Sequence, residues 1–71
     1  MSEQVCPITL ALFIDPVMTK YGHTYERKAI MEQVRRNGTD PLTRQGLTSV
    51  DLVPNIAIRK AVAQYKASRL N

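Results

Sequence analysis

The single cysteine and the single histidine limit this fold most strongly, because they remove two common ways of stabilising a small domain. The chain has 71 residues and contains only Cys6 and His23 of these two types. An intramolecular disulfide is therefore excluded, and a structural zinc site, which needs four Cys or His ligands, is nearly excluded. A chain this short buries a modest core. We expect one domain, residues 1–71, held by apolar packing and polar networks, with no metal and no cofactor.

Two proline-containing loops hold the candidate binding residues. The first, residues 6–13, has more apolar side chains than a loop facing only water would have, and the second, residues 39–45, contains Pro41. Side chains two residues apart point the same way in an extended chain, so Ile8 and Leu10 are expected to share a face. With the helix predicted between them, the loops favour a shallow apolar groove that binds another protein. The alternative is that Ile8 and Leu10 belong to the core, as we expect for Leu12 and Val17.

The remaining pattern predicts a small α+β domain. Thr24 and Asn55 are expected to cap two helices, and Asn37-Gly38 to end the first of them. No internal repeat and no low-complexity segment is evident. The predicted order is a strand at 17–20, a turn at Tyr21-Gly22, a strand at 23–25, a helix at 25–36, a capping turn at 48–51, an extended piece at 52–53 and a helix at 56–70.

Catalysis by a residue of the chain itself is poorly supported. The three glycines are isolated, so no phosphate-binding loop is formed. Cys6 has no basic neighbour that would lower its pKa, and a small buried apolar side chain is its expected role. His23 follows a turn glycine, and its ring is expected to make structural hydrogen bonds.

Neither a membrane nor a nucleic acid is favoured as a partner. No apolar run approaches the length that spans a bilayer. The formal charge of +4 permits a nucleic-acid-binding interpretation. However, the basic residues are scattered, and their short pairs fall on predicted helices, where solvated positions are the usual explanation.

Taken together, the motifs resemble the U-box domain of ubiquitin ligases. Their order covers residues from about 5 to 62, and they are Cys6-Pro7-Ile8, Asp15-Pro16-Val17, Gly22-His23-Thr24-Tyr25 with Arg27 and Ile30, Asp40-Pro41-Leu42-Thr43-Arg44-Gln45, Leu47-Thr48 and Leu52-Val53-Pro54-Asn55. The resemblance implies a zinc-free RING-like fold in which hydrogen bonds and salt bridges replace the metal sites. The candidates for that network are Asp15, His23, Thr24, Asp40, Thr43, Gln45, Thr48 and Asn55.

The same resemblance implies a function and its residues. U-box domains bind a ubiquitin-conjugating enzyme that carries ubiquitin as a thioester, and they promote transfer to a lysine without a covalent intermediate of their own. Ile8, Leu10, Gln33 and Pro41 fall at positions that contact the conjugating enzyme. Arg44 falls at the position of a basic residue that bonds both the conjugating enzyme and ubiquitin. Gln33 departs from the family, because many members have tryptophan or another large side chain there.

Other interpretations stay open. One alternative is a non-catalytic interaction or dimerisation domain with the same fold, and another is a nucleic-acid binder driven by charge. A homodimer through the Tyr65 side of the last helix is also compatible with the sequence. The substrate is expected to bind regions outside this chain. We expect an intracellular location, in the cytoplasm or nucleus of a eukaryotic cell, either as a native ligase or as a delivered bacterial protein.

Overall fold

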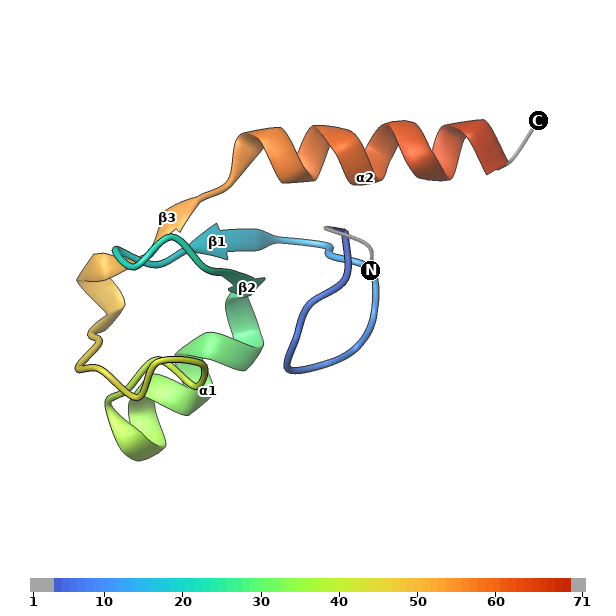
Figure 1. The fold of residues 1–71 in the computed structure, drawn as a ribbon. Helices are drawn as coiled ribbons and strands as arrows, with labels where there is room; N and C mark the ends of the chain where they lie inside the picture. Colours follow the sequence, from blue (N-terminus) through green and yellow to red (C-terminus); the bar gives the residue numbers. More distant parts are fainter. Residues whose placement is uncertain (1–3, 70–71) are drawn as a thin grey trace.

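A three-stranded antiparallel sheet lies at the centre of the computed structural model, which describes residues 4–69 (Figure 1). The strands follow the order β2–β1–β3. Their bounds are Pro16–Met18 for β1, Thr24–Glu26 for β2 and Val53–Pro54 for β3. Val17 of β1 lies opposite Tyr25 on one side and Pro54 on the other. The predicted hairpin and third strand are therefore present, which confirms the α+β fold class.

The hairpin turn forms at the predicted place. Gly22 has a φ of 86°, a left-handed conformation that glycine adopts without steric cost. Its N–H donates to the Thr19 carbonyl at 3.0 Å, and the Thr19 N–H donates to the His23 carbonyl at 2.8 Å. The turn therefore brings β1 and β2 together at one end of the sheet.

Helix α1, Arg27–Asn37, begins two residues later than predicted. The prediction that Thr24 caps it is wrong, because Thr24 lies in β2 and Glu26 occupies the cap position without a side-chain cap bond. Pairing of Tyr25 with Val17 keeps the backbone extended through this segment, so the strand displaces the first helical turn. The predicted end is confirmed, since Gly38 has a φ of 66° and donates to the Val34 carbonyl at 2.9 Å.

Capping determines where the last elements begin. A short 3-10 helix, η1, spans Ser49–Asp51. The Asp51 carboxylate accepts the Thr48 N–H at 3.0 Å, which confirms the predicted capping turn at residues 48–51. Helix α2 spans Ile56–Arg69. Asn55 caps it, because its Oδ1 accepts the Ile58 N–H at 3.1 Å. The predicted last residue of this helix, Leu70, lies outside the described residues.

The core lies between the sheet, the two loops and the inner faces of the helices. Val62 of α2 lies in this core and Ile58 packs against it, and in Figure 1 the helix begins beside the sheet and extends well past it. The expected core positions are confirmed for Val17, which is fully buried, and for Leu12, which packs against the core. No helix within residues 4–69 is both long and apolar enough to cross a membrane. The buried apolar residues of the core are Cys6, Phe13, Val17, Tyr25, Ile30, Leu47 and Val62.

Candidate functional site

In the structure, isolated bridges close the first loop at residues 5–12 and the second at residues 39–46, and the two loops share a pattern of backbone hydrogen bonds. In each, the N–H of one residue donates to the carbonyl four positions earlier: Leu10 to Cys6 at 2.8 Å and Arg44 to Asp40 at 2.7 Å. Leu10 and Arg44 both have a φ of 61°, the left-handed region that non-glycine residues rarely adopt. These two residues therefore hold equivalent positions at the surface of two equivalent turns.

Smaller details of the two loops agree as well. An antiparallel bridge closes each loop, between Val5 and Leu12 in the first and between Thr39 and Gly46 in the second. A threonine hydroxyl oxygen in each accepts the N–H two residues later, at 3.3 Å in the first loop and 3.2 Å in the second. The structure thus corrects the conclusion that the chain has no internal repeat.

The repeat left a short signal in the sequence. Pro7-Ile8-Thr9 in the first loop matches Pro41-Leu42-Thr43 in the second. The structure also corrects the expectation of an extended first loop, because the bond between Leu10 and Cys6 folds it into a tight turn. The argument that Ile8 and Leu10 share a face because the chain is extended therefore does not hold.

A buried acceptor occupies the second position of each loop. Cys6 and Asp40 are both fully buried. The Cys6 Sγ accepts the N–H of Ile8 at 3.4 Å and of Glu26 at 3.3 Å, which confirms a structural role for this thiol. The Asp40 Oδ1 accepts the N–H of Leu42 at 2.8 Å. Sulfur is a weak acceptor and a carboxylate is a strong one, so the second loop is held more firmly.

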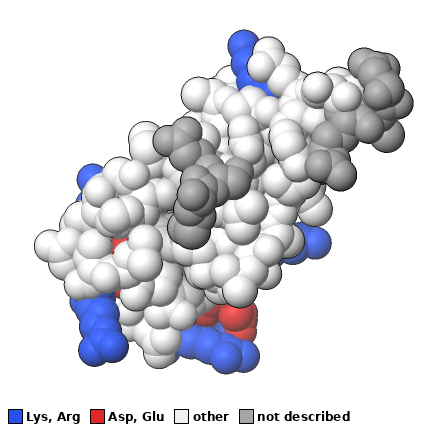
Figure 2. All heavy atoms as spheres, turned by 45° about the vertical axis from the view of Figure 1, so that its right-hand side comes forward, with Lys and Arg blue, Asp and Glu red and all other residues white. Residues whose placement is uncertain are grey.

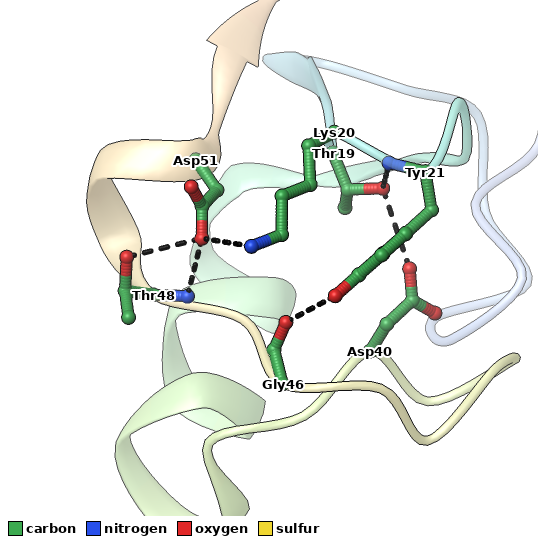
Figure 3. A network of polar contacts seen from close by, with 7 residues as sticks. All are labelled: Thr19, Lys20, Tyr21, Asp40, Gly46, Thr48 and Asp51. Carbon is green, nitrogen blue, oxygen red and sulfur yellow. Dashed lines mark hydrogen bonds and ion pairs between the residues drawn. The ribbon is translucent and has the colours of Figure 1, made fainter.

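The Asp40 carboxylate also receives two side-chain hydroxyls. Tyr25 donates to Oδ1 at 2.6 Å. Thr19 donates to Oδ2 at 3.3 Å (Figure 3). Burial alone would raise the pKa of Asp40, but hydrogen bonds from Tyr25 and from two loop amides outweigh it and the pKa is lowered. Burial and the neighbouring carboxylate raise the pKa of Tyr25. Asp40 therefore stays ionised in the core while Tyr25 stays neutral.

The hairpin turn holds the second loop and the segment after it (Figure 3). The Tyr21 hydroxyl donates to the Gly46 carbonyl at 2.5 Å. Lys20 lies 3.5 Å from the Asp51 carboxylate, which also accepts the Thr48 hydroxyl at 3.1 Å. The hydrogen bond from the Thr48 N–H lowers the pKa of Asp51 most strongly. The loop is therefore fixed from the side of the sheet.

A second network joins the segment just before β1 to both helices. Asp15 pairs with Arg27 at 2.6 Å and with Arg59 of α2 at 3.1 Å. The hydrogen bond from Arg27 outweighs partial burial and lowers the pKa of Asp15. The Glu26 carboxylate accepts the N–H groups of Ile14 and Asp15, each at 2.9 Å. Sequence reasoning found Asp15 but missed the other three charged side chains, because their partners are distant in the sequence.

The other network candidates have mixed outcomes. Asn55 Nδ2 donates to the Thr24 hydroxyl oxygen at 2.8 Å, so that pair joins α2 to β2. The expected hydrogen bonds of the His23 ring are absent among residues 4–69, and Gln45 takes part through its backbone. Within the same residues, no three His, Cys, Asp or Glu side chains are grouped to hold a metal ion. Hydrogen bonds thus hold both loops, and the ion pairs of the described residues lie in the segments outside them.

The predicted binding residues lie at the surface. Ile8 is 40% exposed and Leu10 is 77% exposed, so neither belongs to the core. Arg44 is exposed, and its side chain has no hydrogen bond or ion pair with any described residue. Gln33 on α1 and Pro41 in the second loop are half-buried. The two apolar residues that follow the first loop differ in burial: Phe13 lies in the core, and Ile14 is 77% exposed.

Comparison with known proteins identifies the family. The family model described as the U-box domain matches residues 2–71. The E3 ubiquitin-protein ligase CHIP of Arabidopsis thaliana is 51% identical over 61 residues, which cover 84% of this chain and 22% of that protein. The putative E3 ubiquitin-protein ligase LIN-1 of Lotus japonicus is 46% identical over 65 residues, or 87% of this chain and 4% of that protein. U-box domain-containing protein 13 of Arabidopsis thaliana is 43% identical over 61 residues, 84% of this chain and 9% of that protein.

These relatives are much longer than the chain, which spans less than a quarter of each. The match nevertheless covers nearly all of the chain, and two of the three relatives carry the name of a ubiquitin ligase. The α+β architecture and the absence of a metal-binding group among the described residues agree with the same family. The chain therefore belongs to the U-box family.

Proposed function

We propose that this domain is a ubiquitin ligase module, which binds a ubiquitin-loaded conjugating enzyme and promotes transfer of ubiquitin to a substrate lysine. The names of its relatives support a ligase role at the level of the family. Ile8, Leu10, Gln33 and Pro41 contact the conjugating enzyme, and Arg44 bonds both that enzyme and ubiquitin. The substrate binds regions outside this chain.

The equivalence of the two loops is the observation that carries this proposal. The same backbone position presents an exposed apolar side chain at Leu10 and an exposed cation at Arg44. An apolar side chain on a fixed turn can supply the binding energy of a contact. A guanidinium without an intramolecular partner among the described residues keeps its donors for another molecule.

Arg44 acts on the reaction by orientation. Its planar guanidinium offers several N–H donors in a fixed arrangement, so it can bond carbonyl groups of two proteins at once. Holding ubiquitin against its carrier favours the geometry in which a lysine attacks the thioester. A covalent intermediate on this chain has no support, because the Cys6 thiol is fully buried and already accepts two backbone amides.

The test is discharge of a ubiquitin-loaded conjugating enzyme onto free lysine, measured across a panel of such enzymes. We expect the wild-type domain to accelerate discharge. Ile8→Ala should weaken binding of the conjugating enzyme by about fivefold or more, because truncating an interface anchor commonly costs that much. Arg44→Ala should slow discharge by about tenfold or more while binding of the unloaded enzyme stays within twofold of wild type.

Matched controls separate these effects from general surface changes. Val50→Ala removes an apolar side chain that is 87% exposed on η1, and Lys60→Ala removes an exposed cation on α2. Both should behave as wild type. A folded wild-type domain that accelerates discharge with no enzyme of the panel would leave the alternative, a non-catalytic interaction domain. Wild-type discharge by Arg44→Ala would remove the role of that residue.

The remaining parts of the proposal concern partners and location. We propose no nucleic-acid partner, since Figure 2 shows Lys and Arg side chains apart from one another at the margins of one face. Lys20, Arg27, Arg35, Arg36 and Arg59 are paired with carboxylates. A single unpaired cysteine, Cys6, supports a reducing intracellular setting.

A homodimer through the exposed side of α2 is tested by sedimentation of the wild-type domain and Tyr65→Glu.

A further inference from the structure

The backbone of Arg44 is held in an unfavourable conformation by a small number of bonds. Its φ of 61° lies in the left-handed region, which costs a side-chain-bearing residue free energy unless neighbouring bonds enforce it. The Arg44 N–H donates to the Asp40 carbonyl at 2.7 Å, and the Asp40 N–H donates to the Gln45 carbonyl at 2.9 Å. Asp40 therefore determines the direction in which the Arg44 side chain leaves the loop.

Asp40 is itself fixed by the sheet. Its Oδ1 accepts the Tyr25 hydroxyl at 2.6 Å and the Leu42 N–H at 2.8 Å. Tyr25 is fully buried, and its backbone pairs with Val17 in the adjacent strand. A rigid phenol from the sheet thus reaches across the core and holds the residue at the second position of the second loop.

We infer that the hydrogen bond from Tyr25 to Asp40 positions Arg44 for ubiquitin transfer, an inference that rests on the proposed function. Tyr25 and Asp40 are positioning residues, because the buried phenol and carboxylate act through Arg44. The first loop supplies the comparison. In the first loop the Cys6 thiol takes the place of the Asp40 carboxylate, and its donor is the Glu26 N–H where Asp40 has the Tyr25 hydroxyl. The Tyr25 hydroxyl therefore does not hold the turn that presents Leu10.

Amide hydrogen exchange tests the positioning without any ligase assay. The amides of Arg44 and Leu10 make equivalent bonds, so the ratio of their exchange rates cancels a general loss of stability. In Tyr25→Phe, which keeps the ring and removes the hydroxyl, this ratio should rise about tenfold, the usual effect of losing a hydrogen bond to a charged group. An unchanged ratio, with both amides exchanging faster together, would show a merely structural role and overturn the inference.

Two further variants sharpen this measurement. Tyr21→Phe is the matched control, because it removes another phenol that bonds the second loop, at the Gly46 carbonyl. Its ratio should stay within twofold of wild type, and an increase equal to that of Tyr25→Phe would contradict the assignment to Asp40. Asp40→Asn keeps the size of the side chain and removes its charge. It should raise the ratio by about threefold, and it decides the question if Tyr25→Phe does not fold.

A discharge assay tests whether the positioning matters for transfer. Tyr25→Phe should lower the maximal discharge rate by about fivefold, while the concentration of loaded conjugating enzyme that gives half of that rate stays within twofold. In an Arg44→Ala background, Tyr25→Phe should change the rate by less than twofold, because its effect passes through Arg44. An equal further loss in that background would overturn the inference.

The two assays separate failure of the inference from failure of the proposed function. If the wild-type domain accelerates no discharge, the proposed function fails. The exchange ratio then still decides whether the Tyr25 hydroxyl holds the Arg44 backbone. If discharge is accelerated but the ratio is unchanged, the proposed function stands and the positioning role is wrong.

Discussion

At the scale of single residues, the two left-handed positions combine strain with exposure. Leu10 and Arg44 both have a φ of 61°, and both side chains point away from the core. A left-handed backbone costs a non-glycine residue about 1 kcal/mol or more. Selection for folding alone would favour glycine at such positions. Keeping a large side chain at each therefore supports a use for those side chains in binding.

This contrast predicts opposite effects of Leu10→Gly on stability and binding. Glycine relieves the strain but adds about 0.5–1 kcal/mol of unfolded-chain entropy, so we expect a net gain of up to about 1 kcal/mol in the free energy of unfolding. Little packing is lost, because Leu10 is 77% exposed. Binding of the conjugating enzyme should nevertheless fall. Urea unfolding and a binding titration give the two values, and a clear loss of stability would show that the turn is not strained.

At the scale of elements, sequence patterns predicted the helix ends correctly where a local capping bond determines them. Asn55 and Gly38 were found correctly, because each makes its bond within four residues of its own position. Thr24 was misjudged, because pairing between β1 and β2 outweighed its preference for a helix start. The equivalent loops were missed, since a thiol and a carboxylate do not look alike in sequence although Cys6 and Asp40 both act as buried acceptors.

The network around Asp15 predicts how the elements respond to acid. Its pKa is lowered from the ordinary value of 3.8 by Arg27. A lowered folded-state pKa means that the stabilisation is complete above that ordinary value and is lost as the pH falls through the lower one. Half-exposed ion pairs contribute at most about 1 kcal/mol. Asp15→Asn should therefore lower the melting temperature by several degrees at pH 7 and by less near pH 2.

Glu32→Gln is the matched control for this prediction. The Glu32 carboxylate accepts hydrogen bonds from Arg35 and Arg36, which lower its pKa to about 2. All three residues lie within α1, whereas Asp15, which precedes β1, pairs with a residue of each helix. We expect a smaller change at pH 7 for Glu32→Gln than for Asp15→Asn. Melting curves from pH 2 to 8 give the comparison, and equal changes would argue against a role for Asp15 in joining elements.

At the scale of the whole molecule, the loops depend on buried acceptors where a zinc-bound domain would depend on metal. Asp40 accepts four donors, and among the described residues no group of side chains is arranged to hold an ion. Treatment with a chelator should therefore leave the melting temperature within about 1 °C of the untreated value, since no binding energy of a metal is lost. A fall of several degrees would show that an ion contributes to the fold.

Asp40→Ala should unfold this domain, as removal of the metal unfolds a zinc-bound one. The change leaves the buried hydroxyls of Tyr25 and Thr19 without their acceptor, and each buried unsatisfied donor costs about 1–3 kcal/mol. Two part-buried loop amides lose the same acceptor. A small domain has about 0.05–0.15 kcal/mol of stability per residue, so we expect Asp40→Ala to be largely unfolded at 25 °C. The equivalent change in the first loop, Cys6→Ala, removes only weak sulfur bonds and a small volume, so this variant should stay folded at 25 °C with a lower melting temperature. Circular dichroism of the two variants would decide, and equal losses would contradict the stronger role assigned to the carboxylate.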